Sequence, residues 1–343
     1  MTNDRKITFG VLIGTRGFFN GELARQGRKD MISVLDKLGF GYVILDESAT
    51  PTGCIETLAD AAKAADLFIE KRKQIDGIIV TLPNFGDELG IVNAIDKAGL
   101  QVPVMVQACD DENDKVSVNE RRDAFCGKLS VCNNLYQYGI PFTDTTFHTC
   151  KITSEIFEND LRRFAAVCRI VKGLTHARIG AIGARPAAFQ TMRFSEKLLQ
   201  NSGITVVPVD MSEILGAAGR IGNDEPAVKE KLEEIHAYGN IPEHINKENI
   251  LRQARFTIAS ERWIEENDID AAAFQCWTSI QENYGCATCL TMSMFSEKLI
   301  PSACEVDVCG TLSMYALALA TGQPAALLDW NNNFGKDRDM CVC

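Results

Sequence analysis

The 343-residue sequence contains no run of about 20 apolar residues, and it therefore predicts no transmembrane helix. Its opening, "MTNDRKITFGVLIGTRG", also lacks the apolar core of a secretory signal, which favours a cytoplasmic protein. An excess of positive charge is missing as well. The formal net charge is −11, which argues against nucleic acid or an anionic membrane surface as partners.

Nucleotide-binding motifs are also missing. The glycine-rich stretches "GTRGFFNG" and "GAIGARP" match neither G-x-G-x-x-G nor the P-loop pattern. Most of these glycines are better explained as tight turns between a strand and a helix. Arg16, within the first stretch, has a guanidinium group that could bind sugar hydroxyls or a carboxylate.

Cysteine, by contrast, is abundant. A chain of this length with 13 cysteines and no signal peptide is expected to hold reduced thiols rather than a disulfide framework. Cys286 and Cys289 form a C-x-x-C pair within an apparent helix, Glu282–Leu299, where such spacing usually reflects packing. Because Cys304, Cys309, Cys341 and Cys343 follow, a thiolate metal site stays open as an alternative.

Short apolar runs alternate with amphipathic stretches through the first half of the chain. This pattern predicts an α/β fold with a parallel sheet covered by helices on both faces. The expected strands are 7–13, 42–46, 76–82 and 102–107, and the helices between them are 21–38, 55–73 and 87–98. They form a predicted doubly wound domain over residues 1–172, which ends with a helical stretch at 154–171.

The same alternation then restarts and predicts a second doubly wound parallel-sheet domain over residues 173–300. Its expected strands are 177–183, 204–210 and 270–276, and its helices are 189–200, 225–237 and 247–266. Residues 301–343 are expected to begin a third, C-terminal domain, with a strand at 325–330. The abrupt final "DRDMCVC" suggests a fragment of a longer protein.

Polar residues follow the predicted strands, where ligands bind in open α/β sheets. Arg16 follows the first strand, and Asn84 and Asp87 follow the third. In the second domain, Arg185 and Arg193 follow the first strand, and Trp277 and Glu282 follow the third. Such a lining suits a polyhydroxylated ligand.

Two acidic residues, Glu305 and Asp307, interrupt an otherwise apolar segment, "PSACEVDVCGTL". Acidic side chains are seldom buried unless they are paired or bind a metal. Glu282 and Asp307 are separated by one helix and one return strand, which can bring both to one sheet edge. Together they would suit Mn²⁺ or Mg²⁺. The alternative is that Glu282 only stabilises a helix start while Glu305 and Asp307 are exposed.

The run from Cys276 to Gly335, "CWTSIQENYGCATC…DWNNNFG", resembles the L-fucose isomerase-like family, a relative of the L-arabinose isomerases. "GARPAAFQTMRFSEKLL" and "TLPNFGDE" are similar to that family too. The resemblance implies an aldose–ketose isomerase that works through a cis-enediol with Mn²⁺, or with another divalent ion such as Mg²⁺ or Co²⁺. It implies Glu282 and Asp307 as metal ligands and catalytic residues, with Glu305 in support.

The same resemblance implies a monosaccharide substrate in contact with Arg16. Asn84 and Trp277, which follow other strands, are expected to line the same substrate cleft, and a homo-oligomer is expected. One departure stands out. The family's third ligand is a histidine in its C-terminal domain, and here no histidine follows Asp307. We therefore expect the third ligand beyond residue 343 and an inactive fragment. The alternative function is a non-catalytic sugar-binding or sensor protein, because two doubly wound domains with a cleft also build such receptors.

Overall fold

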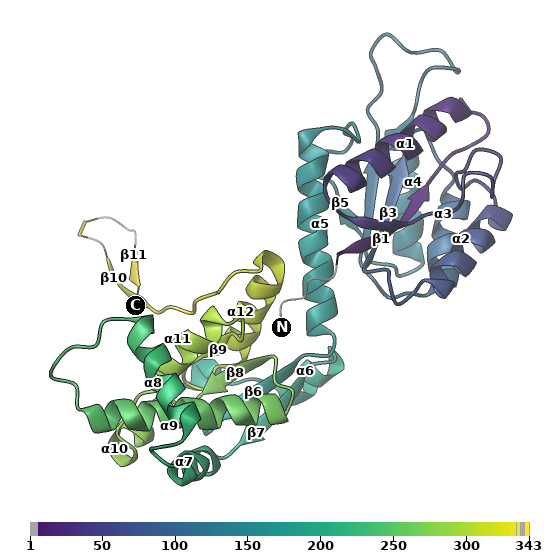
Figure 1. Ribbon diagram of the computed structural model, residues 1–343. Helices are drawn as coiled ribbons and strands as arrows, with labels where there is room; N and C mark the ends of the chain where they lie inside the picture. The colour runs from purple at the N-terminus through teal and green to yellow at the C-terminus, as the bar shows by residue number, and fades with distance from the viewer. Residues whose placement is uncertain (1–5, 334, 337–339, 343) are drawn as a thin grey trace. The chain divides into compact units, whose positions relative to one another are not determined.

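The computed structural model describes residues 6–333, 335–336 and 340–342 of the chain (Figure 1). The chain divides into two compact units, Met1–Lys172 (unit 1) and Gly173–Cys343 (unit 2). Each unit is built around its own parallel sheet, so the predicted α/β class is confirmed. No helix within the described ranges is long and apolar enough to cross a membrane.

Unit 1 contains a five-stranded sheet in the order β2-β1-β3-β4-β5, and every pairing is parallel. The strands are β1 (Thr8–Ile13), β2 (Gly41–Val43), β3 (Gly77–Leu82), β4 (Val104–Ala108) and β5 (Thr143–Asp144). The helices are α1 (Gly21–Lys37), α2 (Leu58–Glu70), α3 (Glu88–Ala98), α4 (Ala124–Gln137) and α5 (Glu155–Leu174), the last of which runs across the boundary between the units.

The two faces of this sheet are covered by different helices because side chains alternate along each strand. Phe9, Val11 and Ile13 of β1 pack with buried residues of α1 and α5. Leu12 of the same strand points into a second core that includes α2, α3 and α4. Both faces of the sheet are therefore buried, which explains why the central strands are nearly continuous apolar runs.

Unit 2 repeats the plan with a four-stranded parallel sheet in the order β7-β6-β8-β9. The strands are β6 (Arg178–Ile182), β7 (Thr205–Val209), β8 (Ala271–Phe274) and β9 (Ser302–Ala303). The helices are η1 (Gln190–Met192), α6 (Glu196–Asn201), α7 (Met211–Arg220), α8 (Pro226–Tyr238), α9 (Lys247–Glu266), α10 (Ser279–Asn283), α11 (Cys289–Glu297) and α12 (Val308–Thr321). Helices α7, α8, α9 and α11 contribute to one core, and α6 and α12 to the other.

The two units share one hydrogen-bonding arrangement at the amino ends of their strands. In unit 1, Asp76 precedes β3, and its carboxylate accepts the backbone N–H of Thr8 at 3.0 Å. In unit 2, Asp270 precedes β8, and its carboxylate accepts the backbone N–H of Arg178 at 2.8 Å. Each aspartate thus joins the third strand of its unit to the first. Asp76 is more deeply buried and also binds Lys172 at 2.8 Å.

Two details of the sequence prediction are wrong. The expected continuous helix Glu282–Leu299 is broken into α10 and α11, because Gly285 adopts a left-handed φ of +84° between them. Residues 325–329 form no strand, and Leu328 is 55% exposed; the strand β10 (Trp330–Asn333) begins only at Trp330 and pairs with β11 (Met340–Val342).

The expected start of a C-terminal domain at Pro301 stays a prediction. In the structure β9 pairs with β8 in the sheet of unit 2, and α12 packs against the same core. Residues 301–321 therefore contribute to the sheet and the core of unit 2.

Candidate functional site

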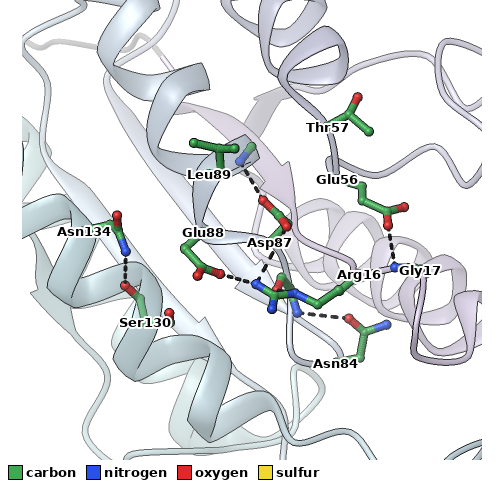
Figure 2. Close-up of polar contacts among 12 residues, drawn as sticks. Arg16, Gly17, Glu56, Thr57, Asn84, Asp87, Glu88, Leu89, Ser130 and Asn134 are labelled. Carbon is green, nitrogen blue, oxygen red and sulfur yellow. Dashed lines mark hydrogen bonds and ion pairs between the residues drawn. The ribbon is translucent and has the colours of Figure 1, made fainter.

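Arg16 lies at the carboxyl end of β1 and is held in place by the loop that follows β3 (Figure 2). Its Nε donates to the carbonyl of Gly86 at 3.1 Å, and its guanidinium lies 4.4 Å from the ring centroid of Phe85. The same guanidinium forms ion pairs with Glu88 and, at 3.7 Å, with Asp87. The side chain is still 33% exposed, so it is oriented by the protein and open to a ligand.

Asn84 links the loops that follow β1 and β3. Its side chain is fully buried, donates to Thr15 Oγ1 at 3.1 Å and accepts the backbone N–H of Gly86 at 3.2 Å. A buried amide must satisfy its own hydrogen bonds, and here its partners lie in these two loops. Asn84 therefore helps to position the Arg16 loop, and its contact with a substrate stays a prediction.

Glu56 and Asp87 also accept backbone hydrogen bonds at this edge of unit 1. Glu56 accepts the backbone N–H of Gly17, next to Arg16 (Figure 2). Asp87 caps α3 by accepting the N–H of Gly90 at 3.0 Å, which is a favourable position for a carboxylate. The polar groups around Arg16 are thus paired with one another.

At the carboxyl edge of unit 2, β8 and β9 lie side by side, so the loops after them share one end of the sheet. Trp277 follows β8 and is 55% exposed, and Glu282 lies in the short helix α10 of the same loop, also exposed. Asp307 follows β9, is half-buried, and caps α12 by accepting the N–H of Gly310 at 2.8 Å.

The turn between β9 and α12 has an unusual backbone. Glu305 and Val306 have φ angles of +63° and +53°, in the left-handed region that a β-branched residue such as valine rarely adopts. Val306 donates its N–H to the carbonyl of Phe274 at 3.0 Å, which ties the turn to the end of β8. Strained residues held in this way are frequent at functional sites.

This turn brings three ligating side chains together. One ligand atom each from Cys276, Cys304 and Glu305 lies within 4.8 Å of the other two. It is the single group of three or more such His, Cys, Asp or Glu side chains in the described part of the chain. Burial, together with the negative charges of Asp329 and Asp307, raises the pKa of Glu305.

The interaction between the two thiols shifts their pKa values in opposite directions. The interaction with Cys304 lowers the pKa of Cys276, because the Cys304 S–H stabilises the Cys276 thiolate. The same interaction, with burial, raises the pKa of Cys304. The edge of unit 2 therefore brings two thiols close to the carboxylates of Glu305 and Asp307.

The predicted metal ligands Glu282 and Asp307 lie in the loops that follow the neighbouring strands β8 and β9, at the same edge of the sheet. Their direct convergence on one ion stays a prediction, because the three-residue cluster above includes neither. The C-x-x-C pair does not converge within the described residues: Cys286 is buried and Cys289 is exposed. The side chain of Cys341 and the whole of Cys343 lie outside the described residues.

Sequence reasoning missed the pairing of Cys276 with Cys304. The available signal was that each cysteine ends or follows an apolar strand. That signal could not be used without knowing that β8 and β9 are adjacent.

The two arginines after β6 bind carbonyl groups of their own loop. Arg185 donates to the carbonyls of Pro186 and Phe189, and Arg193 donates to that of Gln190.

Comparison with known proteins gives consistent matches. Residues 10–175 match the family described as fucose/sulfoquinovose isomerase, N-terminal domain. The chain is 25% identical over 259 residues to a sulfoquinovose isomerase of Priestia megaterium, which covers 75% of this chain and 56% of that protein. It is 31% identical over 165 residues to a sulfoquinovose isomerase of Alkalicoccus urumqiensis, covering 46% and 36% respectively. The first of these alignments spans about half the length of the relative that it matches.

Proposed function

We propose that the chain belongs to the fucose isomerase-like family, whose N-terminal domain matches residues 10–175, and that the protein is an aldose–ketose isomerase. The observation that carries the proposal is the length of the match. An alignment of 259 residues is longer than unit 1, so the similarity to a sugar isomerase extends into unit 2, where the predicted catalytic carboxylates lie.

Glu282 and Asp307 are the proposed ligands of a divalent cation, Mn²⁺ or alternatively Mg²⁺ or Co²⁺. The donor set fits such an ion, because carboxylate oxygens are the ligands that hard cations prefer. The local electrostatics fit as well. Burial raises the pKa of Glu305, and the negative charges of Asp329 and Asp307 raise it further; a cation would offset those charges. When bound, the ion would supply Lewis-acid polarisation of the sugar carbonyl.

The carboxylates Glu282 and Asp307 are also proposed to move the proton. One carboxylate would take the proton from the carbon next to the carbonyl, leaving a cis-enediolate of the open-chain sugar. The hydroxyl proton on that carbon would pass to the former carbonyl oxygen through the cis-enediol stage, and the same or the other carboxylate would return a proton to the neighbouring carbon, giving the ketose. Asp307 is suited to this work, because its cap to Gly310 fixes its side chain while leaving the residue half-buried.

Substrate recognition is assigned to exposed groups at the two sheet edges. Arg16 has donors that can bind sugar hydroxyls, and Trp277 offers an exposed aromatic surface. Because Glu88 and Asp87 already offset the charge of Arg16, this guanidinium is better suited to neutral hydroxyl groups than to an anionic one. We propose a monosaccharide substrate and a cytoplasmic homo-oligomer.

The test is an isomerisation assay of the complete gene product with a panel of aldoses in the presence of Mn²⁺. The panel should contain neutral sugars and sulfoquinovose. We expect conversion of at least one aldose to its ketose, and the loss of that conversion when the divalent ion is removed by a chelator. Tight sugar binding without conversion would instead favour the sugar-binding or sensor function.

A further inference from the structure

Cys276 and Cys304 meet because of the register of two neighbouring strands. β8 and β9 are parallel, with Ala273 opposite Ala303. Cys304 follows β9 directly, and Cys276 lies two residues beyond the end of β8. Both thiols therefore emerge at the same end of the sheet.

The left-handed turn that follows adds the third group. A chain that continued in extended form would carry Glu305 to the opposite face from Cys304. The positive φ angles at Glu305 and Val306 change that direction, and the hydrogen bond from Val306 to Phe274 holds the turn against β8. As a result, a carboxylate oxygen of Glu305 lies within 4.8 Å of both sulfur atoms.

The spacing and burial of the three groups match the needs of a cation. Ligand atoms around a tetrahedral zinc ion, with bonds of roughly 2.0–2.3 Å, lie about 3.3–3.8 Å apart. Separations of at most 4.8 Å therefore need a closure of only about 1 Å. Cys276 is 5% exposed, whereas Cys304 and Glu305 are half-buried, so an ion can enter from the solvent side.

We propose that Cys276, Cys304 and Glu305 form a binding site for a thiophilic divalent cation of the zinc class. Two thiolates and one carboxylate provide three protein ligands, with a fourth position for water. Soft sulfur ligands select zinc over Mn²⁺ and Mg²⁺, so this site differs in chemistry from the site proposed for the isomerase, which has Glu282 and Asp307 and no thiolate among its proposed ligands. The proposal does not depend on that activity.

Cobalt(II) is the probe, because a cobalt–thiolate bond gives a charge-transfer absorption that oxygen ligands do not give. The 343-residue chain is reduced, freed of metal and reductant under nitrogen, and titrated with Co²⁺ after its free thiols have been counted. We expect a charge-transfer band that saturates at one ion per chain. Addition of Zn²⁺ should abolish the band, because zinc displaces cobalt from thiolate sites.

Variants assign the ligands. C276S and C304S should each remove at least half of the band, whereas C289S and C309S, which change exposed cysteines of the same region, should leave it intact. E305Q should keep the band but weaken Co²⁺ binding about tenfold or more. Circular dichroism confirms that each variant is folded.

Three results would overturn the proposal. The first is the absence of a charge-transfer band in the wild-type chain whose thiols are shown to be free. The second is a band that survives both C276S and C304S. The third is a Co²⁺ affinity that E305Q leaves unchanged, which would remove the carboxylate from the site.

Discussion

Units 1 and 2 are built on the same plan but differ at the ends of their strands. At the amino ends, Asp76 and Asp270 make equivalent hydrogen bonds to the first strand of each sheet. At the carboxyl ends, unit 1 has Arg16 paired with two carboxylates, whereas unit 2 gathers two thiols and the carboxylate of Glu305. The amino ends of the strands, which are alike in the two units, stabilise the fold. The carboxyl ends, which differ, hold the residues proposed for function.

The difference suggests a division of labour. The groups around Arg16 satisfy one another, so they form a prepared surface that can recognise a ligand at little cost in reorganisation. The groups around Asp307 are crowded and have perturbed acidities, which is typical of residues that bind ions or move protons. Unit 1 therefore offers groups suited to ligand recognition, and unit 2 offers groups suited to ion binding or proton transfer.

The largest expected effect comes from the carboxylates of unit 2. E282Q and D307N should each lower kcat of the isomerase by about 10²–10⁴-fold, the usual contribution of a general acid or base. E297Q, which changes an exposed glutamate of α11, is the matched control and should retain kcat. Steady-state kinetics measure this, and normal turnover in either E282Q or D307N would remove that residue from the reaction.

A second comparison separates reaction from folding at Asp307. D307N keeps a side chain that can cap α12, whereas D307A loses the hydrogen bond to Gly310 and about 1 kcal/mol of stability. Denaturant unfolding should therefore distinguish the two variants although both lack activity. Equal stability of D307A and wild type would mean that the cap contributes nothing.

The amino ends of the sheets give the next effect. D76A should lower the free energy of unfolding by about 1.5–3 kcal/mol, because it leaves a buried N–H without its charged acceptor. D270A should cost only about 1 kcal/mol, since Asp270 is less buried. All three tryptophans lie in unit 2, so their fluorescence reports unit 2 and circular dichroism reports both units. A larger loss in D270A would contradict this ranking.

Recognition by unit 1 should give a smaller effect. R16A should raise KM of the isomerase about tenfold, the value of one hydrogen bond, with a lesser effect on kcat. R16K keeps the charge but loses the planar fork, so it should recover only part of the affinity. An unchanged KM in R16A would show that this edge does not contact the substrate.

Alkaline pH should produce the mildest effect. Burial raises the pKa of Cys54 to about 11 and that of Cys150 and Cys168 to about 12. Above pH 9 these thiols ionise in the unfolded chain but stay protonated when folded, so stability falls as pH rises towards 12. In unit 2, Cys286 has a comparable shift. As the pH is raised, the free energy of unfolding measured by circular dichroism should therefore begin to fall at a lower pH than the value measured by tryptophan fluorescence.

Much of the fold was predictable from the sequence because both sheets are covered on two faces. Strands such as residues 77–82 are buried throughout, and a continuous apolar run reveals them. The break at Gly285 was harder to predict, since the apolar periodicity of the two flanking helices hides a single left-handed residue. The strand order could not be read either, because pairing is decided by contacts that are distant in sequence.

The candidate site was predictable to the extent that it depends on which loop follows which strand. Arg16, Trp277, Glu282 and Asp307 all lie at strand ends. The burial of Asn84 could not be predicted from its position after a strand, and its contact with a substrate stays a prediction. The pairing of Cys276 with Cys304 was missed because both residues look like ordinary apolar core until β8 and β9 are placed together.

The central claim, that carboxylates of unit 2 move a proton between neighbouring sugar carbons, is tested most directly by isomerisation in heavy water. The account predicts that the ketose formed by the complete gene product carries deuterium from the solvent at the reacting carbon. It also predicts that D307N forms no labelled product. Rapid conversion with no deuterium in the product would show direct hydride transfer, and would contradict the account.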